Sequence, residues 1–308
     1  MLVENRLSIE NQIRFHNSSW SFPLAALKQL SNRTSAKQSR PIMIENNLPC
    51  IDIGANLTSS QFKGDVEQVI AESRTAGLDR VILTGSSVEN SNRSVEICKR
   101  HPDFLYCTAG IHPHDAKEFD EGVTTDQLRQ LYPQPEVVAV GECGLDYNRD
   151  FSPRDKQRIC FAAHLELAAE TQLPLFLHER DAHDDFLAMM TEARDSISRG
   201  VVHCFTGSAE AAKAYLDLDL HLGITGWICD ERRGVHLREL VKTIPANRLM
   251  IETDSPYLAP RDYRPKIKRN EPKYLPHILK TIAECRSEPA EELGSAIIHT
   301  TFEFFGIQ

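Results

Sequence analysis

Several features that would define a protein class at once are missing from this 308-residue sequence. It contains no run of 18 apolar residues, so we expect no membrane-spanning helix. No continuous apolar stretch follows a basic start, so the N-terminus does not resemble a signal peptide. None of the eight cysteines forms a C-x-x-C pair. This pattern favours buried free thiols in a reducing cytosol over a disulfide framework, and we expect a cytoplasmic protein.

Positive charge is also scarce. The chain has 35 Lys and Arg against 44 Asp and Glu, a formal net charge of -9. This balance argues against a protein that coats nucleic acid by bulk charge, but it leaves room for an enzyme that binds a few phosphates through metal ions and a local basic cluster. Hydrophobic residues make up 41% and charged residues 26%, which excludes wholesale disorder, collagen and a coiled coil.

The chain divides into two parts by composition. Residues 1–46 are polar, rich in Asn, Ser and Arg, and without a sustained period, which predicts a poorly ordered extension. From residue 47 to residue 308, short β-type runs alternate with longer helical patterns. We expect this second part to be one domain.

The β-type runs are apolar almost throughout instead of alternating with polar residues. Continuous apolar runs are typical of strands that are covered on both faces, as in parallel sheets. The eight predicted strands are Cys50–Ile53, Arg80–Leu83, Leu105–Ala109, Val137–Val140, Leu175–Leu177, Gly200–His203, His221–Ile224 and Leu249–Glu252.

The segments between these runs carry helical signals. Ser152 followed by Pro153 predicts a capped helix that runs towards residue 171, and Ser208 predicts the start of another. Leu237, Leu240, Val241 and Ile244 form an apolar stripe, and residues 289–305 carry a similar one with Leu293, Ile297, Thr301 and Phe304. Eight strands over about 255 residues predict a (β/α)₈ barrel. A doubly wound sheet is the alternative, although no glycine fingerprint follows the first strand.

Titratable residues follow most of the predicted strands. Because the carboxyl ends of all barrel strands meet at one rim, side chains from distant parts of the chain converge there. Imidazole and carboxylate groups are the usual ligands of Zn²⁺ and Mn²⁺, and carboxylates also bind Mg²⁺. A divalent cation would also offset the cost of burying carboxylates. The residues concerned are His112, Glu142, His178, His203 and Asp254.

Each of these residues has an ordinary structural explanation when it is taken alone. His178 or His203 could be a hydrogen-bonded structural histidine, Glu142 a capping carboxylate and Asp254 a turn residue. The turn that contains His112 and His114 could be no more than a turn. Their joint occurrence at five strand ends favours a metal site.

At these positions the sequence resembles the TatD-related DNase family of metal-dependent hydrolases, from about residue 50 to the C-terminus. The stretches that carry the resemblance are Asp52–Leu57, Ala109–His114, Ala139–Asp146, Leu177–His178, His203–Gly207, Gly223–Gly234 and Glu252–Leu258. The resemblance implies a (β/α)₈ metal-dependent hydrolase with Glu142, His178, His203 and Asp254 as metal ligands. It also implies 3′→5′ exonuclease activity on single-stranded DNA, with some activity on RNA.

One departure from the wider family concerns the first strand. Many members begin with an Asp-x-His-x-His motif, whereas Gly54 and Asn56 take the two histidine positions here, as in the TatD subgroup. Neither residue can offer an imidazole to a transition metal. One well-bound metal ion, and a second bound weakly through Glu142, His112 and water, is the resulting expectation.

The mechanism that we infer from this resemblance is hydrolysis of a terminal phosphodiester by a metal-activated water. Mg²⁺ or Mn²⁺ is the expected cofactor, with Zn²⁺ as an alternative. Asp254 accepts the proton of the water or ligates the metal, Glu142 ligates it, and His112 contacts a phosphate oxygen or completes the metal shell. The predicted phosphate contacts are Arg180, Arg232, Arg233 and the basic run from Arg261 to Arg269, which is otherwise a solvated loop. Trp227 or Tyr257 stacks a base or packs in the interior.

Two other functions remain open at this point. The same barrel serves amidohydrolases and enzymes that cleave the ester of D-aminoacyl-tRNA, although the missing histidines and the lack of an obvious bridging lysine count against an amidohydrolase. A non-catalytic binding protein on the same scaffold is the other alternative. We expect a monomer with a single-stranded nucleic acid as its substrate and no membrane partner.

Overall fold

A ring of eight strands forms the centre of the part of the chain that the structure describes. The computed structural model describes residues 48–307, and the predicted N-terminal extension lies outside them. The strands are β1 (Cys50–Ala55), β2 (Leu78–Leu83), β3 (Leu105–Ala109), β4 (Val137–Asp146), β5 (Leu175–Arg180), β6 (Gly200–Val202), β7 (His221–Ile224) and β8 (Leu249–Ile251).

The strands lie in sequential order, and each pairs in parallel with the next. The ring is completed where the segment after β8 meets the end of β1. There the Asp254 amide donates to the Gly54 carbonyl at 2.8 Å, and the Asn56 amide donates to the Ser255 carbonyl at 2.7 Å. This sequential order confirms the predicted (β/α)₈ barrel and excludes the doubly wound alternative, whose strand order reverses at a switch point.

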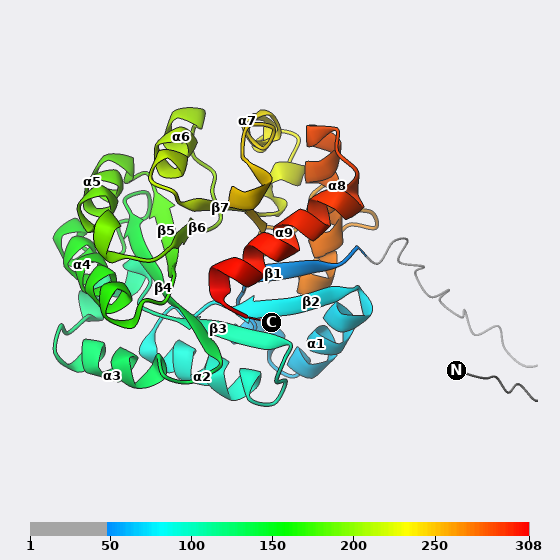
Figure 1. The fold of residues 1–308 in the computed structure, drawn as a ribbon. Coiled ribbons are helices and arrows are strands. Elements are labelled where there is room, and N and C mark those ends of the chain that lie inside the picture. Colours follow the sequence, from blue (N-terminus) through cyan, green and yellow to red (C-terminus); the bar gives the residue numbers. More distant parts are fainter. Residues whose placement is uncertain (1–47, 308) are drawn as a thin grey trace, which may run out of the picture. The chain divides into compact units, whose positions relative to one another are not determined.

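Helices connect the strands and cover the outside of the ring (Figure 1). They are α1 (Val66–Thr75), α2 (Val88–Cys98), α3 (Val123–Leu131), α4 (Arg154–Thr171), α5 (His183–Ala193), α6 (Ala209–Asp217), α7 (Val235–Leu240), α8 (Leu275–Arg286) and α9 (Ala290–Phe305). Short 3₁₀ turns η1 (Ser60–Phe62), η2 (Pro113–Glu118), η3 (Arg194–Ser196), η4 (Gly226–Cys229), η5 (Ala246–Arg248) and η6 (Pro272–Tyr274) lie in the connections.

The predicted helix starts have different outcomes. Ser208 caps α6, because its hydroxyl accepts a hydrogen bond from the Ala211 amide. The cap predicted at Ser152 is wrong, since Pro153 is the N-cap residue of α4. The Ser152 hydroxyl instead donates to the His114 carbonyl at 2.7 Å and accepts from the Lys117 amide at 3.0 Å. It therefore holds the loop after β3 against the start of α4.

Two apolar clusters stabilise the barrel. The larger one lies between the strands and the surrounding helices. The smaller one combines inward-facing strand residues such as Ile53, Phe176 and Met250 with Phe304 and Phe305 of α9. Helix α9 covers the amino ends of the strands, because Arg199, just before β6, donates to the Glu303 carbonyl at 2.7 Å. The other end of the barrel carries the polar residues.

Two further expectations concern cysteines and membranes. All eight cysteines lie within residues 48–307 and are free, six of them buried, which confirms the expected lack of a disulfide framework. Within the described residues, every helix is too short or too polar to cross a membrane.

Candidate metal centre

The carboxyl end of the barrel contains a polar cavity of about 500 Å³. The predicted site residues come together here from five separate strand ends. The lining includes Asn56, His112, His114, Glu142, His178, His203, Cys204, Asp254 and Tyr257. The expected convergence of the catalytic and metal-binding candidates is therefore observed.

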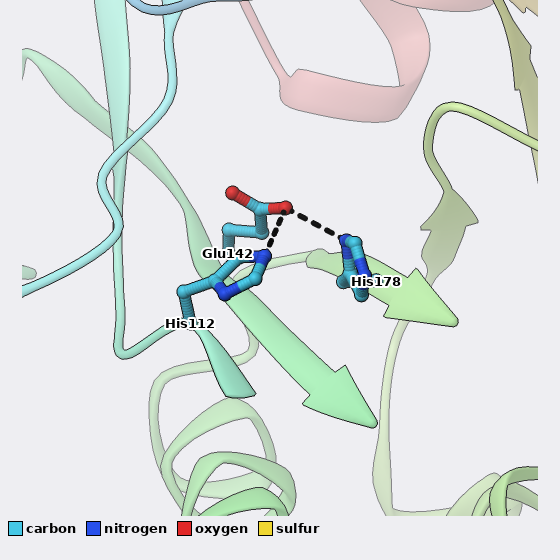
Figure 2. Close-up of side chains that lie close together, drawn as sticks. All are labelled: His112, Glu142 and His178. Carbon is cyan, nitrogen blue, oxygen red and sulfur yellow. Dashed lines mark hydrogen bonds and ion pairs between the residues drawn. The ribbon is translucent and has the colours of Figure 1, made fainter. Parts of the chain in front are cut away.

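Glu142 is the centre of the arrangement. Its Oε1 atom lies 3.0 Å from His178 Nδ1, 2.7 Å from His203 Nε2 and 3.3 Å from His112 Nε2. Figure 2 shows His112 and His178 on two sides of this carboxylate. Three imidazole nitrogens from three different elements thus surround one oxygen atom.

The strand boundaries explain how these side chains meet. β4 continues past the predicted end at Val140 as far as Asp146, so Glu142 lies inside the strand and points into the cavity. β5 likewise extends beyond Leu177 and includes His178. β6 ends at Val202, one residue earlier than predicted, so His203 begins the loop at the rim.

His112 is held in place by its own turn. It is the N-cap residue of η2, where its Nδ1 accepts a hydrogen bond from the His114 amide at 3.0 Å. The preceding amide, that of Ile111, donates to His164 Nε2 of α4 at 3.0 Å. With Nδ1 used as an acceptor, Nε2 of His112 faces Glu142. His112 therefore both caps the turn η2 and forms part of the cavity wall.

The pKa values reflect burial and the opposing charges. Burial by itself would raise the pKa of Glu142, but the neighbouring imidazoles outweigh it and hold that pKa well below its usual value. Burial would lower the pKa of His203, yet Glu142 and Glu252 raise it well above the usual value. For His112, burial dominates and lowers the pKa. The site thus attracts positive charge even though it is buried.

Asp254 lines the same cavity. Its Oδ1 accepts a hydrogen bond from Asn56 Nδ2 at 2.9 Å. Burial raises the pKa of Asp254 to about 7, and the carboxylates of Glu252 and Glu142 add to this while His203 opposes it. Asp254 also has a φ angle of 51°, in the left-handed region that is uncommon outside glycine and recurs at functional sites.

Glu252 is a site residue that the sequence argument missed. It is fully buried after β8, its Oε2 lies 3.2 Å from His203 Nδ1, and its Oε1 accepts from the Cys204 amide. A Cβ atom at Gly54 would lie 2.2 Å from Oε2, and one at Gly223 would lie 2.7 Å from Oε1. The two glycines therefore leave the space that this carboxylate occupies.

The replaced histidine positions of the first strand now have a physical explanation. The Glu252 carboxylate fills the space beside Gly54, and Asn56 orients Asp254. Gly54 and Asn56 therefore each contact an acidic residue that follows β8 and help to position it. The signal in the sequence was the acidic pair Glu252 and Asp254, of which only Asp254 was assigned a role.

Asp146 is a second missed residue, at the end of β4. Its Oδ2 lies 2.6 Å from His114 Nε2 and 3.5 Å from His178 Nε2. Burial by itself would raise the pKa of Asp146, but the hydrogen bonds from His114 and the Arg149 amide, together with the nearby His178 imidazole, hold it below its usual value. Asp146 therefore orients the His114 imidazole and faces that of His178. It is the last residue of the same Gly-Glu-Cys-Gly-Leu-Asp stretch that contains Glu142.

The donor set fits a divalent cation. One ligand atom each from His112, Glu142 and His178 lie within 4.8 Å of one another, and His203 adjoins the same carboxylate. His178 Nε2 is buried and makes no hydrogen bond within the described residues. A mixed set of imidazole nitrogens and carboxylate oxygens suits Mn²⁺ and Zn²⁺, and Mg²⁺ when oxygen ligands complete the shell.

The predicted phosphate contacts lie beside this cavity and not in its wall. Arg233 and Arg261 pair with the buried Asp230 at 3.0 and 3.1 Å, and Arg232 Nε is 4.0 Å from the same carboxylate. Arg180, at the end of β5, lies 5.9 Å from the Trp227 ring. The far end of the basic run has a structural role. Arg269 binds Asp65 and Glu271 at 2.7 and 2.8 Å and so ties this segment to the start of α1.

Comparison with known proteins agrees with this geometry. The family model "TatD related DNase" matches residues 51–306. A protein from Pantoea sp. named "3'-5' ssDNA/RNA exonuclease TatD" is 48% identical over 82% of this chain and 98% of its own length. One of the same name from Erwinia billingiae is 51% identical over 79% of this chain and 94% of its own.

Solved structures are similar as well. A TatD homologue from Escherichia coli K12 covers 85% of this chain and all of its own, with 27% identity and a TM-score of 0.78. A TatD family hydrolase from Entamoeba histolytica covers 83% of this chain and 97% of its own, with 27% identity and a TM-score of 0.76. With its barrel, its Glu-His cavity and a family match over most of its length, the chain belongs to the TatD-related DNase family.

Proposed function

We propose that this protein is a metal-dependent 3′→5′ exonuclease that hydrolyses single-stranded DNA and also RNA. The observation that carries the proposal is the buried Glu142 carboxylate surrounded by His112, His178 and His203 at the carboxyl end of the barrel. The name shared by relatives that are about half identical supports the polarity and the substrate.

In this proposal, Glu142, His178 and His203 hold a divalent cation, and Asp254 ligates it or acts as a base. When bound, the cation lowers the pKa of a water molecule and offsets the charge that develops on the phosphate. Where Asp254 acts as the base, it takes up the proton of the attacking water. Asn56 keeps that carboxylate oriented through its 2.9 Å hydrogen bond.

The remaining residues bind and orient the substrate. His112 stays neutral because burial lowers its pKa, so its Nε2–H can donate to a phosphate oxygen without adding charge. Arg180, Arg232, Arg233 and Arg261 are the proposed phosphate contacts. We further propose Mg²⁺ or Mn²⁺ as the cofactor, with Zn²⁺ as an alternative that the imidazole donors also suit. We also propose that the protein is a monomer and that it acts in the reducing cytosol. The free cysteines support this compartment.

The first test uses single-stranded DNA labelled at its 5′ end. With Mg²⁺ or Mn²⁺, the protein should shorten it stepwise from the 3′ end, and EDTA should stop the reaction. Glu142→Ala and His203→Ala should each lower the rate by about a thousandfold, since a catalytic metal supplies several kcal/mol. Glu96→Ala, an exposed carboxylate change on α2, is the matched control.

The outcomes separate this proposal from its rivals. Full activity of both site variants would contradict the metal-dependent mechanism. A parallel panel of RNA, D-aminoacyl-tRNA and small esters identifies a different hydrolase if only an ester is cleaved. Metal analysis of protein prepared without chelators identifies a non-catalytic binding protein if neither metal nor activity is found.

A further inference from the structure

A second, basic hollow lies next to the candidate metal centre. It is a groove of about 670 Å³ between η4 and the segment that follows β8. Leu258 lines this groove, while its neighbour Tyr257 lines the metal-site cavity. Consecutive residues thus line the two cavities, so the groove adjoins the candidate metal centre.

The groove concentrates positive charge in an acidic protein. Arg233, Arg261, Arg264 and Lys266 line it, and Asp230 is the acidic residue among its lining side chains. Asp230 is buried and forms ion pairs with Arg233 and Arg261, so two guanidinium groups gather beside one carboxylate. The whole chain has a net charge of -9, so this local excess of cations favours a polyanion at this place.

An aromatic ring lies among these cations. Trp227 is partly exposed, and its indole N–H donates to the Arg233 carbonyl at 3.3 Å. The Arg233 guanidinium lies 4.4 Å from the ring centroid, and that of Arg180 lies 5.9 Å from it. Arg180 ends β5, two residues after His178, so the aromatic group is linked to a strand that carries a candidate metal ligand.

We propose that this groove binds the single strand on the 5′ side of the nucleotide being removed. The phosphates contact Arg233, Arg261, Arg264 and Lys266, and one base stacks on Trp227. Cationic grooves with an aromatic platform bind single strands without regard to sequence, because each base offers a π-face. This inference rests on the proposed nuclease function, since the groove would hold the part of the strand that stays outside the catalytic cavity.

Binding is measured first, because it does not depend on catalysis. A fluorescent oligothymidylate of about twelve nucleotides, within the site sizes of such grooves, is titrated with the protein in EDTA. Trp227→Ala should weaken binding by roughly five- to a hundredfold, the range reported for loss of one stacked base. The double variant Arg264→Glu, Lys266→Glu should weaken binding at least as much. The slope of log affinity against log salt concentration should become less negative by about 0.7 for each phosphate contact that is lost.

The control reverses the charge of a single lysine, half the charge change of the double variant, at the opposite end of the barrel. Lys99→Glu alters an exposed lysine directly after α2, next to the connection that enters the amino end of β3. It should bind the oligonucleotide like the unmodified protein. Cleavage of bis(p-nitrophenyl) phosphate, which is too small to reach the groove, should suffer much less in the groove variants than cleavage of the oligonucleotide.

The results distinguish this inference from the proposed function. If the unmodified protein binds the strand and both groove variants lose binding, the groove is confirmed even when cleavage is absent. If the protein degrades DNA but the groove variants bind and cleave like Lys99→Glu, the groove proposal is overturned while the nuclease stands. Absence of any binding by the unmodified protein also overturns it. Because Arg264 and Lys266 are exposed, their double variant remains informative if Trp227→Ala fails to fold.

Discussion

The two ends of the barrel differ in what fills them. At the amino ends of the strands, Phe304, Phe305 and Ile307 pack against the apolar interior of the barrel. At the carboxyl ends, an open cavity is lined by imidazoles and carboxylates. The amino end thus contributes apolar packing, and the carboxyl end contributes the titratable groups of the candidate site.

Two buried histidines, one at each end of the barrel, have pKa values shifted in opposite directions. His221 begins β7 at the amino end and packs against Phe304 with ring centroids 4.8 Å apart. Burial lowers its pKa to about 4, and Arg248 adds to the effect. His203 at the other end is equally hidden, but two carboxylates raise its pKa well above the usual value. Burial alone does not decide the charge of a histidine; its charged neighbours do.

We expect the greatest loss of stability from a change at the apolar end of the barrel. Phe304→Ala should lower the free energy of unfolding by about 3–5 kcal/mol, because it leaves a cavity in a fully packed region. Urea denaturation measures the loss. The folded fraction should retain its activity and its Mn²⁺ affinity. Glu303→Ala, an exposed neighbour in α9, should change stability by less than about 0.5 kcal/mol.

That result would be contradicted in one specific way. If Phe304→Ala folds normally yet loses metal affinity as strongly as a change at the rim does, the two ends are coupled and the division of roles is wrong.

The second prediction concerns acid. His221 has a folded pKa of about 4 against an ordinary value of 6.5, so the unfolded chain takes up the proton first as the pH falls. The contribution of neutral His221 to the free energy of unfolding is complete above pH 6.5 and is lost as the pH falls from about 6.5 to about 4. The loss amounts to at most about 3 kcal/mol, from 1.36 kcal/mol per pKa unit. His221→Phe should therefore make the free energy of unfolding less sensitive to acid in this range.

Urea unfolding at a series of pH values measures this difference. The unmodified protein and His221→Phe should lie furthest apart in their pH dependence below pH 6.5. Parallel stability curves for the two proteins would show that His221 does not titrate as inferred.

The third prediction sharpens the account of the polar end. Glu252→Gln should weaken Mn²⁺ binding by about 10- to 100-fold, because the Glu252 carboxylate orients His203, the imidazole that we propose as a metal ligand. Isothermal titration measures the affinity, and the thermal midpoint reports whether the fold survives. Gly54→Ala should act in the same direction, since its Cβ would lie 2.2 Å from the Glu252 carboxylate.

A glycine away from the cavity provides the control. Gly64→Ala meets nothing within 4 Å, although its φ of 101° adds some strain, so it should cost stability without changing Mn²⁺ affinity. Unaltered Mn²⁺ binding in both Glu252→Gln and Gly54→Ala would remove the positioning role assigned to Glu252.

Much of the architecture follows from local sequence patterns. Continuous apolar runs predicted all eight strands, because strands covered on both faces need no polar side chains. The helix over residues 290–305 followed from its apolar stripe, and its Leu293, Ile297, Thr301 and Phe304 are all buried. Strand ends were predicted less well, since β4 and β5 continue through polar residues that are stabilised by the cavity and not by an apolar core.

The sequence by itself determined the barrel and five of the residues at its polar rim, His112, Glu142, His178, His203 and Asp254, because periodicity and strand-end position are local properties. Only the tertiary structure decided which atoms meet. It placed three imidazoles on one oxygen of Glu142, put Glu252 beside Gly54, and gathered three arginines around Asp230. Such contacts join residues up to about 200 positions apart, and their distances depend on the closure of the ring, which no local pattern encodes.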